Sequence, residues 1–142
     1  MMNAKRLKAE QCVLAQRLPA GWYRFENIGG GNPFVRFAAR TNRGNVYTIH
    51  VELADFPLEV PAVYVTRMLH DRDGDPLDSC SASMHVLNSS NGWTRICHYG
   101  YDSWNDHVSL YKIFVKARLW LEMYEQHLRD GHDIDYWLTH QA

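Results

Sequence analysis

The chain has 142 residues, of which 46% are hydrophobic and 13% aromatic, a composition that suits one compact domain over residues 1–142. Its net charge is −1, so no overall field attracts nucleic acid or an anionic membrane, and binding to either requires a local patch. No apolar run is long enough to span a bilayer, and Met1–Arg6 lacks the apolar core of a signal peptide. We therefore expect a cytoplasmic protein that binds neither membranes nor nucleic acid.

The cysteines Cys12, Cys80 and Cys97 are widely spaced. An odd number of cysteines without a Cys-x-x-Cys pair fits neither a disulfide framework nor a zinc site. The eight histidines are scattered along the chain. The chain also lacks a glycine-rich nucleotide-binding fingerprint. We expect reduced thiols, no metal site and no cofactor.

The first predicted element is an amphipathic helix from Asn3 to Leu18, which Pro19 ends. Its leucines recur on one side, and charged residues such as Glu10 are expected to face water. Cys12 is expected on the inner side of this helix. The sequence therefore begins with a helix that covers another element.

Segments with strand character follow, separated by turns rich in glycine, asparagine and proline. They are Trp22–Ile28, Phe34–Arg40, Val46–Leu53 and, after a segment interrupted by prolines, Ala62–Met68. The third segment alternates between apolar and polar residues, which predicts one buried face carrying Ile49 and Val51. The short connections predict a four-stranded antiparallel meander.

The stretch Leu69–Tyr101 lacks sustained periodicity and is rich in Asp, Ser, Asn and Gly. A loop of this length in a small domain is usually functional or disordered. It contains Cys80, His85, Asn88 and Cys97, which favours function. We therefore predict a long active-site loop.

The segment Val108–Leu128 has apolar residues at three- and four-residue steps, which predicts the main core helix. Asn105 or Asp106 is predicted to cap its start and Gly131 to end it. Asp133–His140 is predicted as a short closing helix. The fold class is therefore α+β, with the long helix packed on the apolar face of the meander.

Cys97 lies between Ile96 and His98, and Trp104 precedes the long helix. A cysteine on a loop ahead of a helix, with aromatic neighbours, is a candidate nucleophile, whereas the alternative is a buried thiol that packs as a small hydrophobe. As a nucleophile, Cys97 is expected to be partly exposed or to lie under a mobile loop. It should then be alkylated faster than Cys12.

Three motifs carry a resemblance to a known family. Phe56-Pro57, with a second proline at Pro61, is followed by Val63; Ile96-Cys97 is followed by Trp104; and Leu119–Glu125 is followed by Gly131. Together they resemble the ubiquitin-conjugating enzymes: the aromatic-Pro-x-x-Pro-Pro-x-Val segment, the Ile-Cys-Leu active-site segment and the Trp-Leu-x-x-Tyr-Glu helix of a divergent bacterial branch found in antiphage operons. The resemblance covers roughly residues 45 to 135.

The resemblance implies a ubiquitin-conjugating-enzyme-like fold and an acyltransferase activity. Cys97 would hold the C-terminal glycine of a partner as a thioester and pass the acyl group to an amine. The bacterial members that stand alone occur beside a nucleotidyltransferase that makes a cyclic oligonucleotide signal, so this cyclase is the implied partner. A ubiquitin-like modifier with its activating enzyme is the alternative. Since the chain has no room to activate a carboxylate itself, a second protein should supply the activated acyl group.

Other residues receive roles from the same resemblance. Asn88 would stabilise the tetrahedral intermediate or hold the loop, with Asn91 as the reserve candidate. His85 and His98, when protonated, would lower the pKa of the thiol, or His85 would tie the loop together through backbone hydrogen bonds. Asp102 would orient an incoming lysine, although an exposed carboxylate needs no such role.

The chain departs from the family pattern, because it lacks the His-Pro-Asn tripeptide and the proline after the tryptophan. His70–Arg72 with Cys80 ten positions downstream, or His85 with Asn88, can stand in for the tripeptide. Cys97 is the preferred nucleophile because of its neighbours, and Cys80 is the alternative. Two other classes stay open: a catalytically silent binding module of the same fold, and a thiol hydrolase that uses Cys97 and His85.

Overall fold

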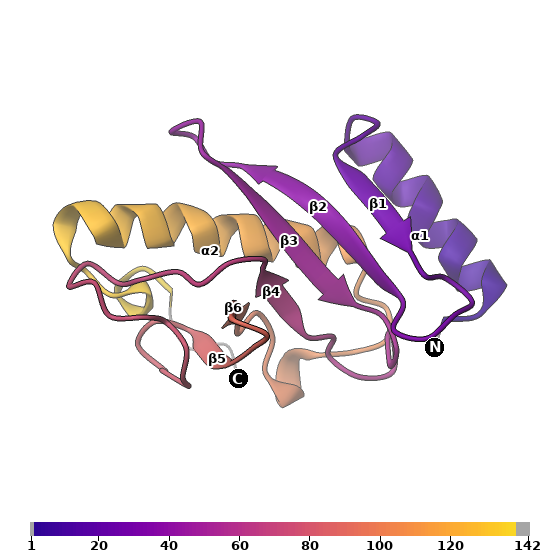
Figure 1. Cartoon of the computed structure of the whole chain (residues 1–142). Coiled ribbons are helices and arrows are strands. Elements are labelled where there is room, and N and C mark those ends of the chain that lie inside the picture. Colours follow the sequence, from indigo (N-terminus) through magenta and orange to yellow (C-terminus); the bar gives the residue numbers. More distant parts are fainter. Residues whose placement is uncertain (1, 139–142) are drawn as a thin grey trace.

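The computed structural model describes residues 2–138 of the chain. In this part the order of elements is α1 (Ala4–Arg17), β1 (Tyr23–Glu26), β2 (Phe34–Arg40), β3 (Val46–Glu52), β4 (Val63–Val65), β5 (Val86–Ser90), β6 (Trp93–Ile96), the 3-10 turn η1 (Tyr101–Ser103), α2 (Leu110–Asp130) and the 3-10 turn η2 (Ile134–Tyr136). The predicted α+β class, with an N-terminal helix, antiparallel strands and a long C-terminal helix, is confirmed (Figure 1).

Within residues 2–138 the strands form one six-stranded antiparallel sheet of order β1-β2-β3-β4-β6-β5. The predicted meander is present as β1–β4, but the prediction of a continuous loop over Leu69–Tyr101 is wrong, since β5 and β6 form a hairpin there. Asn91 and Gly92 connect them with φ values of 56° and 74°. Two successive positive φ angles are typical of the two-residue turns that join hairpin strands.

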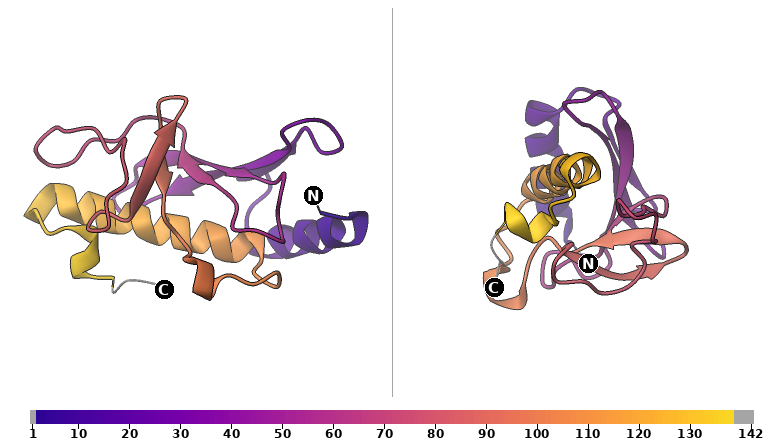
Figure 2. Two further views of the ribbon diagram at one scale, coloured as in Figure 1. Left: turned by 90° about the horizontal axis from the view of Figure 1, so that it is seen from below. Right: turned by 90° about the vertical axis from the view of Figure 1, so that its left-hand side faces the viewer.

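The helices lie on one face of this sheet and leave the other face open (Figure 2). Phe37 and Ile49 are cross-strand partners, both essentially unexposed, and the Phe37 ring lies 5.0 Å from the Phe114 ring of α2. Val51 on the same face is also buried. The prediction that the long helix covers the face bearing Ile49 and Val51 is therefore confirmed.

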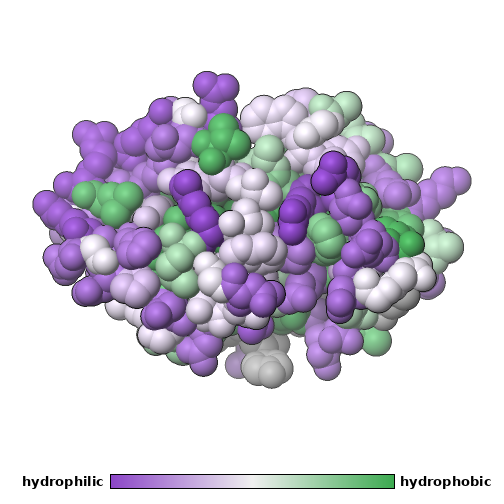
Figure 3. All heavy atoms as spheres, in the orientation of Figure 1, coloured by the Kyte–Doolittle hydropathy of each residue, from purple (hydrophilic) through white to green (hydrophobic). Residues whose placement is uncertain are grey.

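The opposite face carries one row of residues in register across the sheet. Arg24, Arg36, His50, Tyr64 and Arg95 face one another in turn on β1, β2, β3, β4 and β6. Arg36 Nε donates to His50 Nδ1 at 3.1 Å, and burial, with the nearby Arg36 charge, lowers the pKa of His50 to about 4. On the face turned to the viewer in Figure 3, apolar side chains are scattered among polar ones.

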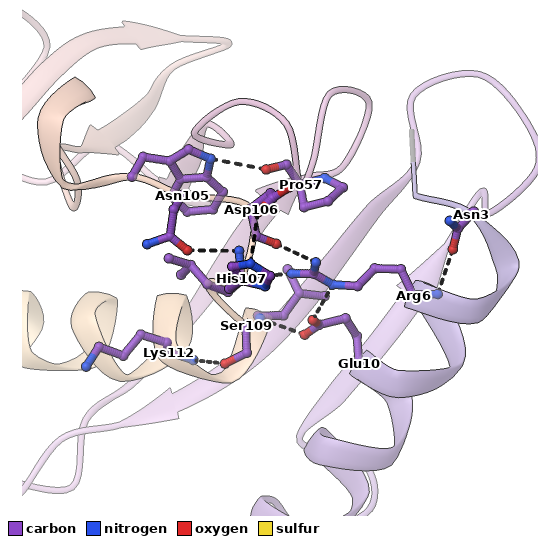
Figure 4. Close-up of polar contacts among 12 residues, drawn as sticks. Asn3, Arg6, Glu10, Pro57, Asn105, Asp106, His107, Ser109 and Lys112 are labelled. Carbon is purple, nitrogen blue, oxygen red and sulfur yellow. Dashed lines mark hydrogen bonds and ion pairs between the residues drawn. The ribbon is translucent and has the colours of Figure 1, made fainter.

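Helix α1 is fixed to the segment that precedes α2 (Figure 4). Glu10, predicted to face water, is 4% exposed, and it accepts hydrogen bonds of 2.8 Å from the Leu110 backbone N–H and from Arg6 Nε. Arg6 Nη2 also donates to the Val108 carbonyl at 2.9 Å. These bonds explain why Glu10 is buried. Cys12, predicted on the inner side, is instead exposed.

The ends of α2 confirm one prediction and correct others. The helix is capped by Ser109, whose hydroxyl accepts the N–H three residues on, rather than by Asn105 or Asp106. Gly131 ends it in the left-handed conformation, at φ 82°, as predicted. Leu128, predicted in the core stripe, is 40% exposed because it lies in the last turn.

The closing helix predicted over Asp133–His140 is a single 3-10 turn, Ile134–Tyr136, in the described part, and residues 139–140 lie outside the described residues. Ile134 is fully buried, which anchors this turn on the core. The helices between residues 2 and 138 are too short or too polar to span a bilayer.

Candidate functional site

Cys97 directly follows strand β6. Its backbone N–H donates to the His85 carbonyl at 2.9 Å, which holds the cysteine against the start of β5. Ile96 before it is buried in the core. The thiol is half-buried, so the prediction that it is at least partly exposed is confirmed.

Cys97 lies in the wall between two hollows. A groove of about 730 Å³ runs along the proline-containing segment, and its remaining wall includes Leu58, Glu59, Val60, Pro61, Leu87, Arg95 and Trp104. A cavity of about 160 Å³ lies on the α2 side, lined by Lys116, Leu119, Trp120 and Met123 among others. Both hollows are also lined by His98, Tyr99 and Gly100. The thiol is therefore approached from an open groove on one side and backed by a small, mostly apolar cavity on the other.

The surroundings of Cys97 shift the pKa of its thiol in both directions. Burial raises the pKa of the thiol above its ordinary value, and the neighbouring Cys80 raises it further. Arg95 and Lys116 oppose this, because a nearby cation stabilises the thiolate. Since burial is the largest cause and the net shift is upward, Cys97 is mainly a neutral thiol at neutral pH.

The two histidines next to Cys97 do not hold it as a thiolate. His98 is 8% exposed, and burial lowers its pKa to about 4, so it is neutral at physiological pH. The suggestion that protonated His98 lowers the thiol pKa is therefore wrong. The His85 ring is held by Asp135 through an Nε2–Oδ1 contact of 2.8 Å, while its backbone carbonyl binds Cys97. His85 thus ties the loop together, as the structural alternative predicted.

Asn88 lies on β5 and holds the Cys80 segment, because its Oδ1 accepts the Cys80 backbone N–H at 2.9 Å. This contact matches the loop-holding role rather than a contact with the Cys97 thiol. Asn91 is in the turn at the opposite end of the hairpin from Cys97. Cys80 itself is exposed, and it stays the alternative nucleophile.

Trp104 anchors the chain between Cys97 and α2. Its Nε1 donates to the Pro57 carbonyl at 3.1 Å, and the centre of its ring lies 6.1 Å from that of Phe56 and 5.4 Å from that of Tyr99. The two motifs that contain Phe56 and Trp104 are therefore adjacent in space. Asp102 is exposed on η1, beside this anchored segment.

Two basic residues of the site were missed by the sequence analysis. Arg95 lines the groove, and its Nε has no hydrogen-bond partner among the described residues. Lys116 lines the cavity, where it is half-buried although the sequence placed it outside the apolar stripe. Its position in the sequence could have indicated this burial, because Lys116 lies three residues after Ile113 and four before Trp120, on the same side of α2.

Among residues 2–138 no group of three histidine, cysteine or acidic side chains is arranged to hold a metal ion. Comparisons with protein-family models, curated proteins and solved structures gave no significant match. The chemistry of the site must therefore be argued from its own residues.

Proposed function

We propose that this protein is an acyl carrier with a ubiquitin-conjugating-enzyme-like fold, and that Cys97 is its nucleophile. The observation that carries the proposal is the position of Cys97 at the groove beside Leu58–Pro61. An extended C-terminal tail of a partner fits such a groove, with its last residue at the thiol. The adjacency of Phe56-Pro57 and Trp104 supports the fold assignment, because both motifs belong to the resemblance.

The reaction has two steps. In the first, the Cys97 thiolate attacks the activated carbonyl of the partner's C-terminal glycine, the carbonyl carbon bonds to sulfur, and the activating group leaves. In the second, an amine attacks the thioester, the C–S bond breaks, and an amide and a free thiol result. Both steps pass through an oxyanion, and the proposed role of Arg95, which also lines the groove, is to stabilise it.

A carrier explains the site better than a cysteine–histidine hydrolase does. Hydrolases of that kind use a histidine-paired thiolate whose pKa lies well below the ordinary range. Here burial raises the pKa of Cys97, and His98 is neutral. The His85 ring is held by Asp135.

The acyl donor is a separate protein that ends in glycine. By the resemblance, this donor is a cyclic-oligonucleotide synthase or, as the alternative, a ubiquitin-like modifier delivered by its activating enzyme. In either case Cys97 has the same role with a different acyl group. The proposed setting is antiphage defence in a bacterial cytoplasm.

The test is to mix the protein with the proteins encoded beside it and ATP, and to measure its intact mass. We expect an adduct equal to one partner minus water, which a thiol reductant removes. It should be absent in Cys97→Ala, persist in Cys80→Ala, and become resistant to reductant in Cys97→Ser, where an ester replaces the thioester. An adduct that survives in Cys97→Ala, or one lost only in Cys80→Ala, would show that Cys97 is not the carrier. A lack of adduct with every partner would favour the silent binding module.

A further inference from the structure

Lys116 is held directly over the backbone that leaves Cys97. Its Nζ donates to the His98 carbonyl at 3.3 Å and lies 3.7 Å from the centre of the Tyr99 ring. His98 and Tyr99 are the two residues that follow Cys97 in the chain. Lys116 and Cys97 also line the same cavity of about 160 Å³. Lys116 and Cys97 therefore belong to the wall of one small cavity.

The environment of Lys116 favours its neutral amine more than an exposed lysine would. Burial is the main cause that lowers its pKa, and the charge of Lys112, one turn earlier on α2, adds to the effect. Cys97 acts in the opposite direction, since a thiolate stabilises the ammonium ion. Because the Cys97 thiol is mainly neutral, this opposing effect is small before acylation and absent after it. Lys116 therefore has a larger fraction of neutral, nucleophilic amine than an exposed lysine would.

We propose that Lys116 is a modification site, which accepts the acyl group from Cys97 and becomes amide-linked to it. This inference rests on the proposed function of Cys97. The lone pair of the Lys116 amine attacks the thioester carbonyl, a C–N bond forms, and the C–S bond breaks. The proton lost from nitrogen goes to the departing sulfur, so the products are an amide on Lys116 and a free Cys97 thiol. The thioester is already activated, and no further reactant is needed.

The size of the cavity limits which acyl groups can make this transfer. A cavity of about 150 Å³ is just large enough for benzene. The cavity that Cys97 and Lys116 both line measures about 160 Å³, so it has room for a small acyl group. A small acylglycine, which ends in the same residue as the proposed donor, is therefore a suitable probe.

The experiment uses the full chain and the thioester of N-acetylglycine with 2-mercaptoethanesulfonate. Intact mass is followed over time with and without hydroxylamine, which cleaves thioesters and leaves amides, and tandem mass spectrometry locates the acyl group. We expect a hydroxylamine-labile adduct on Cys97 first and a resistant adduct on Lys116 later. Since two groups held together react far faster than free ones, the resistant adduct should form at least about 100-fold more slowly in Cys97→Ala.

Two lysine variants separate the roles of charge and nucleophile. Lys116→Arg keeps the cation beside the thiol, so it should still form the labile adduct on Cys97 but not the resistant one. Lys112→Arg, on the exposed side of the same helix, should behave like the wild type.

A resistant adduct on Lys116 that forms equally fast in Cys97→Ala would overturn the transfer, because the probe would then acylate the lysine directly. A labile adduct that stays on Cys97, or that passes to Lys112 as often as to Lys116, would also overturn it while leaving the carrier function intact. If Cys97 takes up no acyl group, the proposed function itself fails, and this inference fails with it.

Discussion

Glu10 connects the N-terminal helix to the start of α2, and its replacement has a cost that the structure allows us to work out. Leu110 is fully buried, and its backbone N–H is bonded to the Glu10 carboxylate at 2.8 Å. In Glu10→Ala this N–H loses its partner, and Arg6 loses its carboxylate. A buried donor left unpaired costs about 1–3 kcal/mol, and a hydrogen bond to a charged group contributes about 1.5–3 kcal/mol. We expect a loss of about 3 kcal/mol in the free energy of unfolding.

A second variant, Glu10→Gln, separates the effect of the hydrogen bond from the effect of the charge. The glutamine keeps an acceptor for the Leu110 N–H but removes the negative charge at the N-terminus of α2, an interaction of about 0.3–2 kcal/mol. We therefore expect a loss of about 1 kcal/mol. In a domain of this size 1 kcal/mol corresponds to roughly 3–4 °C in Tm. The two variants should thus differ in Tm by several degrees.

The assay is urea unfolding followed by tryptophan fluorescence, together with hydrogen exchange at the start of α2. Gln11→Ala, an exposed change on the same helix, is the matched control and should stay within about 0.5 kcal/mol of the wild type. Glu10→Ala should also accelerate exchange of the amide at position 110 more than exchange elsewhere in α2. An equal cost for both Glu10 variants, or one no larger than that of the control, would refute the reasoning.

Three further predictions follow from the same structure. Because Cys97 is half-buried with a raised pKa, iodoacetamide should label it more slowly than the exposed Cys12 at pH 7, and its labelling rate should still increase above pH 9. Peptide mass spectrometry measures both labelling rates, and faster labelling of Cys97 than of Cys12 at pH 7 would contradict the structure. The pKa of His98 is lowered to about 4 in the folded protein, so between pH 6.5 and 4 the unfolded state binds a proton that the folded state does not. The free energy of unfolding should therefore fall by about 1.4 kcal/mol for each pH unit in this range, and His98→Phe should reduce this slope in urea titrations. Trp104→Phe should cost about 1 kcal/mol through the lost hydrogen bond to Pro57, and unchanged stability with unchanged exchange near Cys97 would contradict its anchoring role.

The sequence predicts that Cys97 is labelled faster than Cys12, whereas the structure predicts the reverse, because Cys12 lies on the exposed side of α1. The periodicity of the leucines located the helix correctly, but it did not settle which of the remaining positions are covered. Cys12 was expected inside and Glu10 outside, and the structure has them the other way round. The bonds that bury Glu10 come from Arg6 on its own helix and from Leu110, one hundred residues away. Such a pairing depends on the tertiary structure and leaves no periodic signal.

The sheet shows where local patterns succeed and where they fail. Apolar and polar residues alternate from Tyr47 to Glu52, and the structure confirms the strand and the buried Ile49, although His50 on the opposite face is buried as well. Val86–Ser90 was missed because Asn88 and its serine neighbours are poor strand formers, and this strand lies at the sheet edge. The Asn91-Gly92 pair was the usable signal, since this dipeptide is typical of a two-residue hairpin turn.

The sequence indicated the cysteine of the candidate site, but it did not indicate the basic residues around it. Cys97 stands in a recognisable local motif, and it lines both the groove and the cavity. The sequence alone did not mark Lys116 as a site residue, because a lysine on an amphipathic helix is usually exposed to solvent. Its contact with the segment after Cys97 depends on how α2 packs across the sheet, which no local pattern encodes.

The raised pKa of Cys97 has a consequence for the proposed carrier. A thiol with a low pKa is a good leaving group, so its thioester exchanges quickly with any nucleophile, including water. Burial of Cys97 raises the pKa of its thiol and therefore slows this loss. Arg95 and Lys116 work against burial, but only while the sulfur carries negative charge. In the proposed carrier, Arg95 would thus assist the steps in which sulfur carries charge, while the buried setting would protect the neutral thioester between them.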